Sequence, residues 1–342
     1  MAIIDAATHV HSKPYFEKLL SLPNAATTKK TVSIFLPQSE KNPQFHDVDI
    51  RIADMDKYGI TSQITSIHHA LDPNDLRELD KETEIELCKF LNDCMADFMD
   101  RSRGRIFSVG TLPFSALKNE GVEEMRRAIN DLGLKGFLVL SNIHGKPIDQ
   151  YEEFWAEAER LDVPVYIHPT DPLSNLCREY ENEFDLTHVL GWPFETSLIL
   201  SRLVFSGMMQ KHPRLKIIAH HLGGMIPFFG ERINESYNRR KTTGVSVAKP
   251  DQAVSRIDDR PTVDLFRDFY YDTAVGGSAP AIRCALDVFG AERIVFGTDY
   301  PFGPDGGRHR LATYPGKVKS MGLSKSDNDR IYEETIRRIA KI

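Results

Sequence analysis

Eight short apolar runs, separated by longer stretches of mixed polarity, constrain the fold of this 342-residue chain more than any other feature. The runs are rich in β-branched residues and mostly continuous rather than alternating, which is typical of strands buried on both faces. They cover residues 3–4, 62–67, 106–111, 136–140, 163–167, 215–219, 269–272 and 293–297. Strands that alternate with helices predict an α/β fold of the (β/α)8 TIM-like barrel type, with a doubly wound open sheet as the alternative.

Helical patterns occupy most of the intervals, at residues 82–100, 120–132, 152–161, 196–209, 280–289 and 325–340. Two segments do not fit the repeat. Residues 12–49 contain four prolines, and residues 238–261 are polar with a basic start. We interpret residues 1–342 as one barrel with excursions at these two places. The first is a small N-terminal insertion after strand one and a candidate lid.

The charge balance limits the classes of partner. Lys and Arg number 43 against 49 Asp and Glu, a formal charge of −6, which argues against a nucleic-acid partner because phosphate binding needs clustered cations. No apolar run approaches the roughly 18 residues of a membrane span. The N-terminus has neither the basic start nor the apolar stretch of a signal peptide. We therefore expect a cytoplasmic protein without a membrane or nucleic-acid partner.

Residue types that bind metals follow several of the predicted strands. His9 and His11 lie two apart at the end of the first run, so both side chains point to the same side. His168, the pair His220-His221, and Asp299 each follow another run. In a (β/α)8 barrel these strand ends converge on one mouth, where active sites lie. The set therefore predicts a site that binds metal, although each histidine by itself would more often be a packed core residue.

Several motifs in order along the chain carry a family resemblance. After His9-Val10-His11 come RIADMD at residues 51–56 and VGTLP at 109–113. IHP follows at 167–169, WPFET at 192–196, AHHLGGMIPF at 219–228 and GTDYPF at 297–302. With these the sequence resembles the amidohydrolase superfamily. Within it, the sequence resembles the decarboxylase branch typified by 2-amino-3-carboxymuconate-6-semialdehyde decarboxylase. The resemblance runs along nearly the whole chain.

The resemblance implies one divalent metal ion per chain, held by His9, His11, His168 and Asp299. Zinc is the first expectation, with manganese, iron(II) or cobalt as alternatives for such nitrogen and oxygen ligands. Residues 136–141 contain no lysine that could bridge a second ion, which favours a mononuclear site. The resemblance implies two catalytic residues, His221 and Asp299. It assigns the transfer of protons to His221. His220 is expected to face away, because neighbours on a strand point in opposite directions.

The resemblance also implies two arginines that bind substrate. Arg51 would grip a carboxylate, the alternative being a helix arginine paired with Asp47 or Asp54. Arg232 would reach into a neighbouring subunit's site, which implies a homodimer or larger assembly, the alternative being an ordinary helix salt bridge. His68 and Phe302 are expected to line the pocket, and Asp272 to orient a ligand histidine.

These expectations lead to a metal-dependent, non-oxidative decarboxylase, a carboxy-lyase acting on a small unsaturated or aromatic carboxylic acid. The alternative is a metal-dependent hydrolase or hydratase of the same superfamily, acting on a lactone, an amide or an unsaturated acid, since both chemistries can begin with activated water. A metal-binding protein without catalysis is a third hypothesis. It is weakened because the chain keeps every expected ligand.

Overall fold

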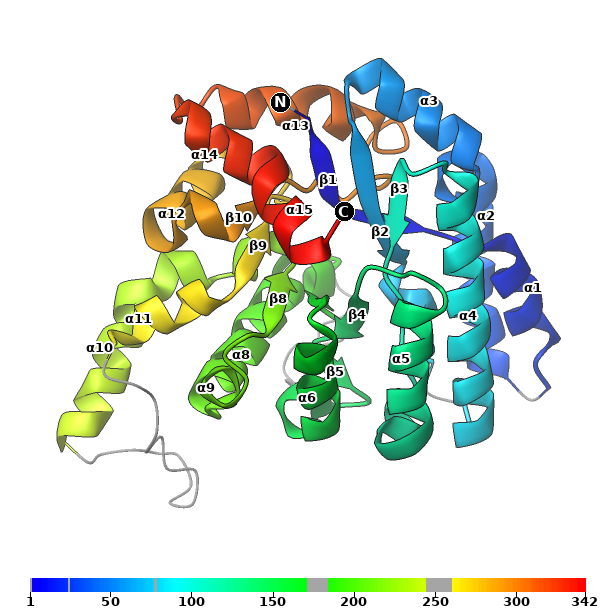
Figure 1. Ribbon diagram of the computed structural model, residues 1–342, viewed down its shortest axis with the longest axis horizontal. Coiled ribbons are helices and arrows are strands. Elements are labelled where there is room, and N and C mark those ends of the chain that lie inside the picture. The colour runs from blue at the N-terminus through cyan, green and yellow to red at the C-terminus, as the bar shows by residue number, and fades with distance from the viewer. Residues whose placement is uncertain (1, 24, 77–78, 171–183, 244–259) are drawn as a thin grey trace.

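The structure is a computed structural model that describes residues 2–23, 25–76, 79–170, 184–243 and 260–342, and the side chains of all but 238–243 among them. Eight strands lie at the centre, with helices arranged around them (Figure 1). The strands are β1 (Ile4–Val10), β2 (Ser62–Ile67), β3 (Ile106–Ser108), β4 (Phe137–Leu140), β7 (Pro164–His168), β8 (Lys216–Ala219), β9 (Tyr270–Asp272) and β10 (Ile294–Val295). Each of the eight predicted strands is confirmed. Strand β1 continues six residues beyond the predicted run at 3–4, and the ends of the others differ by at most three residues.

Parallel pairing closes these strands into a barrel. Hydrogen-bonded ladders run in the orders β1-β2-β3 and β10-β9-β8-β7-β4. The parallel bridge from Gly110 to Phe137 joins β3 to β4, and the parallel bridge from Thr8 to Tyr300 joins β1 to the segment after β10. The circle of neighbours is therefore complete, and the barrel is confirmed over the open doubly wound sheet. A short antiparallel pair, β5 (Asn142–Ile143) and β6 (Lys146–Pro147), lies outside the barrel order.

Helices surround the barrel in chain order. They are α1 (Lys13–Ser21), α2 (Ala26–Lys41), α3 (Val48–Tyr58), α4 (Lys81–Arg101), α5 (Val122–Asn130), α6 (Glu152–Leu161), α8 (Trp192–Phe205), α9 (Met208–Lys211), α10 (Ile226–Thr243), α11 (Thr262–Leu265), α12 (Ala279–Phe289), α13 (Arg308–Lys319), α14 (Lys325–Asp329) and α15 (Thr335–Ala340). Their ends follow ordinary capping rules. The Asp80 side chain accepts from Thr83 N at the start of α4, and Gly59 ends α3 with a left-handed φ of 72°.

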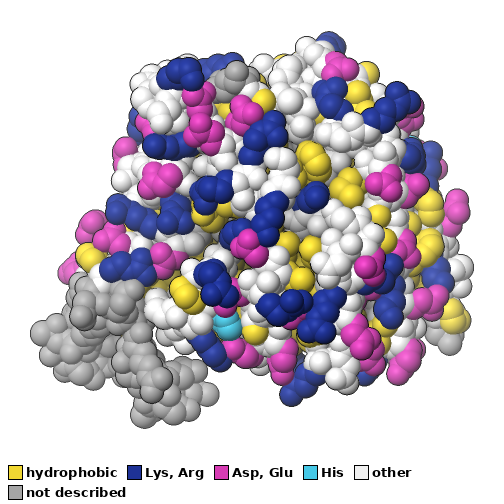
Figure 2. Space-filling view, viewed as in Figure 1, with side chains coloured by type: hydrophobic (Ala, Val, Ile, Leu, Met, Phe, Trp, Pro, Cys, Tyr) yellow, Lys and Arg dark blue, Asp and Glu magenta, His cyan; other side chains and the backbone are white. Residues whose placement is uncertain are grey.

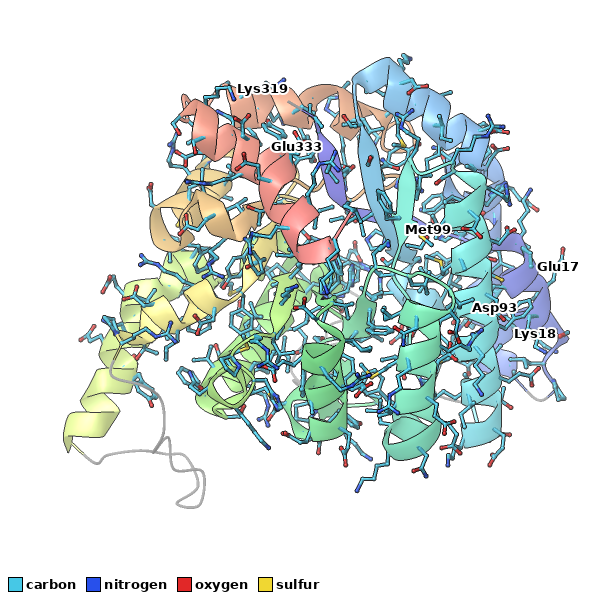
Figure 3. The ribbon with its side chains drawn as sticks, in the orientation of Figure 1. Glu17, Lys18, Asp93, Met99, Lys319 and Glu333 are labelled. Carbon is cyan, nitrogen blue, oxygen red and sulfur yellow. The ribbon has the colours of Figure 1, made fainter. Side chains whose placement is uncertain are left out.

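The segment at residues 12–49 is helical rather than irregular. Ser12 caps α1, and Pro14 lies in its first turn, where proline needs no hydrogen-bond donor. Helix α1, which carries the labelled Lys18, lies beside α4 (Figure 3). Lys18 pairs with Glu86 of α4. The second excursion, at residues 238–261, lies mostly outside the described residues, although α10 extends through 243.

Surface charge is mixed on the face shown in Figure 2, where Lys and Arg are interspersed with Asp and Glu. Within the described residues, no helix is both long and apolar enough to cross a membrane.

Candidate active site

A cavity of about 800 Å³ lies at the carboxyl ends of the strands. Phe35 and Gln38 of α2 form one part of its wall, so the insertion after β1 covers this end of the barrel. The other described lining residues are Ile34, His68, His69, Ala70, Asp75, His168, Asp185, Thr187, His188, Trp192, Asp299, Phe302 and Arg310.

Three buried imidazoles from different strands meet beside this cavity. His9 comes from β1, His168 ends β7, and His220 follows β8. The His9 ring centroid lies 5.4 Å from that of His168 and 5.8 Å from that of His220, and the latter two are 5.0 Å apart. Parallel strands that end at one level thus bring together residues separated by more than 200 positions in the chain.

The Nδ1 atom of each of these imidazoles is already engaged. His9 Nδ1 lies 3.1 Å from Ser66 Oγ, and His168 Nδ1 lies 2.6 Å from the carbonyl oxygen of Pro169. His220 Nδ1 lies 2.7 Å from Asp272 Oδ2, the orienting contact expected of Asp272. Because a carbonyl oxygen only accepts, His168 Nδ1 carries the proton, and its Nε2 is left with a lone pair.

Asp299 faces this group from the segment after β10. Its Oδ1 lies 3.1 Å from His9 Nε2, and its Oδ2 accepts a hydrogen bond of 2.6 Å from Arg310 Nη1. Burial by itself would raise the pKa of Asp299, but the hydrogen bond and charge of His9, together with Arg310, lower it below its ordinary value. The carboxylate is therefore ionised at neutral pH.

These residues fit a divalent metal ion in donor chemistry and orientation. Within the described residues, His220 Nε2 is buried without a hydrogen-bond partner, and His9 Nε2, also buried, contacts only the Asp299 carboxylate. In metal-binding histidines, the ring nitrogen that does not bind the metal usually makes a hydrogen bond that sets the orientation of the ring, as Nδ1 does here. No three His, Cys, Asp or Glu side chains in the described ranges already stand at the spacing of metal ligands. His9 and Asp299 contact each other directly instead.

The structure does not bring His11 to the other predicted ligands. Its ring stacks on Phe45 with centroids 4.0 Å apart, and it lines a second cavity of about 530 Å³ on the side of α1 and α4. Both of its ring nitrogens are buried and unpartnered among the described residues. Burial lowers the pKa of His11 to about 3, so the imidazole is neutral.

Comparison with known proteins identifies the family. A family model described as amidohydrolase matches residues 4–340. The chain belongs to the amidohydrolase family. It is 32% identical over 268 residues to a gamma-resorcylate decarboxylase of Rhizobium radiobacter, covering 74% of this chain and 76% of that protein. It is 28% identical over 260 residues to 2-amino-3-carboxymuconate-6-semialdehyde decarboxylase of Dictyostelium discoideum, covering 75% and 67%.

Among solved structures, one similar protein is a dihydroxybenzoic acid decarboxylase from Polaromonas sp. JS666. It was crystallised with bound manganese and the inhibitor 2-nitroresorcinol. The TM-score is 0.76 at 25% identity, over 99% of this amidohydrolase and 97% of that chain.

The His220 ring of this amidohydrolase points toward His9 and His168, so the prediction that it faces away is wrong. The rule of alternating sides holds only within a strand, and β8 ends at Ala219. His221 begins a tight turn with a left-handed φ of 58°. Its ring also stays near the site, 5.6 Å from that of His168, and lies parallel to Trp192 at 6.4 Å.

Arg51 does not line the cavity, which corrects its predicted place in the substrate pocket. The side chain is fully buried. Its Nε donates to Gln63 Oε1 at 2.7 Å, and its Nη1 donates to the carbonyl oxygens of His9 at 2.8 Å and Gln44 at 3.3 Å. The guanidinium also lies over the Tyr300 ring, 4.8 Å from its centroid. Arg51 therefore holds the end of β1 from beneath the site.

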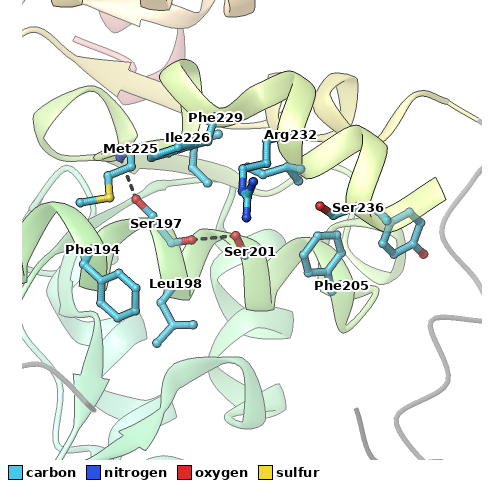
Figure 4. A pocket seen from close by; sticks show the side chains of 12 residues that line it. Phe194, Ser197, Leu198, Ser201, Phe205, Met225, Ile226, Phe229, Arg232 and Ser236 are labelled. Atoms are coloured by element: carbon cyan, nitrogen blue, oxygen red, sulfur yellow. Dashed lines mark hydrogen bonds between the residues drawn. The ribbon is translucent and has the colours of Figure 1, made fainter. Parts of the chain in front are cut away.

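Arg232 also lies outside the cavity. It lines a separate, largely apolar groove of about 500 Å³ between α8 and α10 (Figure 4). Phe194 and Phe229 line the groove too, and neighbouring Phe228 is 78% exposed. Any contact of Arg232 with a substrate would require a second subunit.

The predicted pocket residues His68 and Phe302 do line the cavity, with ring centroids 4.9 Å apart. Phe35 packs edge-on against His68 at 4.5 Å, and His69 stacks on His168 at 4.5 Å. Burial lowers the pKa of His69 to about 3, so it adds a neutral flat ring. The sequence pair His68-His69 at the end of β2 indicated a pocket wall, and both residues line the cavity. Phe35, Trp192 and Arg310 also line it but had no predicted role, since they belong to no metal-binding pattern.

Proposed function

We propose that this amidohydrolase is a metal-dependent, non-oxidative decarboxylase of an aromatic or unsaturated carboxylic acid. The observation that carries the proposal is the convergence of His9, His168 and His220 beside Asp299, each with Nδ1 engaged, under an aromatic cavity. The relatives described above act as decarboxylases by name, and the flat walls suit a planar substrate.

His9, His168 and Asp299 would hold the metal ion, and His11 would complete the set when its ring turns away from Phe45. The two unpartnered nitrogens of His11 support this rotation. A divalent ion bound there would polarise a substrate oxygen as a Lewis acid. The imidazole nitrogens of His9, His11 and His168 are donors that favour zinc. The Polaromonas protein, by contrast, was crystallised with manganese.

The chain's own residues would position the substrate and move a proton. Phe302, Phe35 and Trp192 hold the ring and exclude water from it. When the bond to the carboxyl carbon breaks, CO2 leaves and the electron pair stays on the ring carbon, which takes up a proton. His220 is placed to carry that proton on Nε2, because Asp272 holds its Nδ1. We therefore transfer the role first expected of His221 to His220.

The decisive experiment measures CO2 release from hydroxybenzoates, including 2,6-dihydroxybenzoate, by the wild type and by His220→Asn. The proposal expects CO2 from the wild type and a loss of roughly 100-fold or more in the variant. The matched control is His309→Asn, an exposed histidine on α13, which should keep full activity. Turnover of a lactone or amide without CO2 from any acid would instead support a hydrolase.

Metal content gives an independent test. Elemental analysis should find about one zinc or manganese ion per chain in the wild type, and His9→Ala and Asp299→Ala should lose it. Retention of metal by His11→Ala at wild-type affinity would remove His11 from the ligand set.

We also propose that the groove around Arg232 is covered by a second copy of the chain. The exposed Phe228 and the apolar lining support this assignment. Light scattering of the wild type and Phe228→Glu measures it. A monomeric wild type would refute the dimer.

A further inference from the structure

Arg310 is a cation at the cavity that the mechanism above does not use. It lies in the first turn of α13, and its side chain is 19% exposed. Its Nη1 donates to Asp299 Oδ2 at 2.6 Å and to Thr298 O at 3.1 Å. One arm of the guanidinium is thus fixed to the segment that follows β10.

The other arm is available for a ligand. Arg310 Nη2 donates no hydrogen bond to any residue that the structure describes. Gly303 provides the room for this arrangement, because a β-carbon there would lie 2.6 Å from Arg310 Nε and 3.3 Å from Nη2. A guanidinium anchored at one nitrogen and open at another is prepared to bind a carboxylate with little loss of side-chain entropy.

Among the described residues that line the cavity, Arg310 is the one Lys or Arg. The described lining contains three acids. Asp75 accepts from the Thr170 hydroxyl, Asp185 pairs with His188, and Asp299 contacts His9 and Nη1 of Arg310, which leaves Nη2 of Arg310 open. Arg310 is therefore the permanent positive charge toward which an anionic ligand would orient.

The reaction proposed above decides which anionic group fits Arg310. A departing carboxylate loses its charge as CO2 forms, so a cation bound to it would stabilise the reactant more than the transition state. A group that keeps its charge throughout gives binding energy without this penalty. We propose that Arg310 binds a second carboxylate that the substrate retains, and so selects dicarboxylic over monocarboxylic ring acids. This inference rests on the proposed function for its reaction, but the binding site itself does not depend on turnover.

Unreactive probes test the inference. Benzoate and benzene-1,3-dicarboxylate differ by one carboxylate, and Trp192 in the cavity wall reports binding through its fluorescence. We expect the wild type to bind the dicarboxylate about tenfold more tightly than benzoate. Arg310→Gln should abolish the difference and leave the benzoate affinity within about twofold. Arg310→Lys should keep part of it, because lysine retains the charge but not the fork.

The matched control is Arg308→Gln, two residues away and paired with Asp54 instead of lining the cavity. It should retain the wild-type preference. Equal weakening of both probes in Arg310→Gln would overturn the inference, since Arg310 would then act only by supporting Asp299. Unchanged binding of both probes would overturn it as well. If Arg310→Gln does not fold, Arg310→Lys decides, and a preference equal to wild type refutes the inference. Absence of CO2 release with this selectivity intact would refute the proposed reaction alone.

Discussion

Replacing Arg51 with methionine tests whether this arginine supports the barrel or grips substrate. Methionine keeps much of the length and apolar volume of the side chain but has no donor. The change leaves three buried acceptors without their donor, namely Gln63 Oε1, His9 O and Gln44 O. It also removes the cation that lies over Tyr300.

The expected loss follows from those acceptors. Each buried acceptor deprived of its donor costs roughly 1–3 kcal/mol, and the longest bond, to Gln44 O, belongs at the low end. Relief of the buried charge offsets part of the sum, so we expect the free energy of unfolding to fall by about 3 kcal/mol. This is a large share of a total stability on the order of 5–15 kcal/mol. Arg51→Lys should lose about half as much, because its single ammonium cannot reach all three acceptors with the same geometry.

Urea unfolding followed by circular dichroism measures this difference. Arg101→Met is the control, because that exposed arginine pairs with Asp97 on the surface of α4 and should change stability by less than about 0.5 kcal/mol. An Arg51→Met protein with wild-type stability, but with a much higher KM for the acid it decarboxylates, would refute our reasoning. It would restore the predicted role of Arg51 at the substrate.

Further predictions concern the carboxylates and the metal. Burial raises the pKa of Asp5 to about 7, above its unfolded value near 3.8, so the folded state binds the extra proton and stability falls as pH rises from 4 to 7. In urea titrations at several pH values, Asp5→Asn should reduce the slope of the free energy of unfolding against pH by up to roughly 1.4 kcal/mol per pH unit. An unchanged slope would contradict this prediction. Asp272→Asn should lower kcat roughly 10- to 100-fold and change the tautomer of His220 seen by 15N NMR, and a wild-type tautomer would count against the contact. A chelator should lower the melting temperature, with recovery on adding manganese or zinc; equal melting temperatures would argue against a resident ion.

The barrel was predictable because burial on both faces leaves a clear pattern in each strand. Continuous β-branched runs marked all eight strands, and the chain closes at Thr8 and Tyr300 as a (β/α)8 order requires. The helices α1 and α2 were not predicted, since their prolines resemble those of a loop. Pro14 in fact starts α1, and Pro37 lies inside α2. Proline counts therefore say little until the helix position of each one is known.

The site was predictable where a residue follows its strand directly. His168 ends β7, and Asp299 comes four residues after β10. The choice between His220 and His221 depended on where β8 stops, and one residue of difference in a strand end reverses the side that a residue faces. Strand ends are the least certain part of a sequence pattern, and here the end of β8 at Ala219 decided which histidine faces the site.

The two arginines show what a motif does and does not determine. Arg51 stands in the expected motif, yet its Nε and Nη1 donate to Gln63 and to the backbone beneath β1, and its remaining Nη2 is buried outside the cavity. Arg310 belongs to no motif, yet the turn through Gly303 and the start of α13 bring it to Asp299 and the cavity. An arginine can bind a ligand only with donors that are both free of other partners and open to the cavity. For that reason the hydrogen bonds and burial of each guanidinium, rather than its position in the sequence, distinguish the supporting Arg51 from Arg310, which can meet substrate.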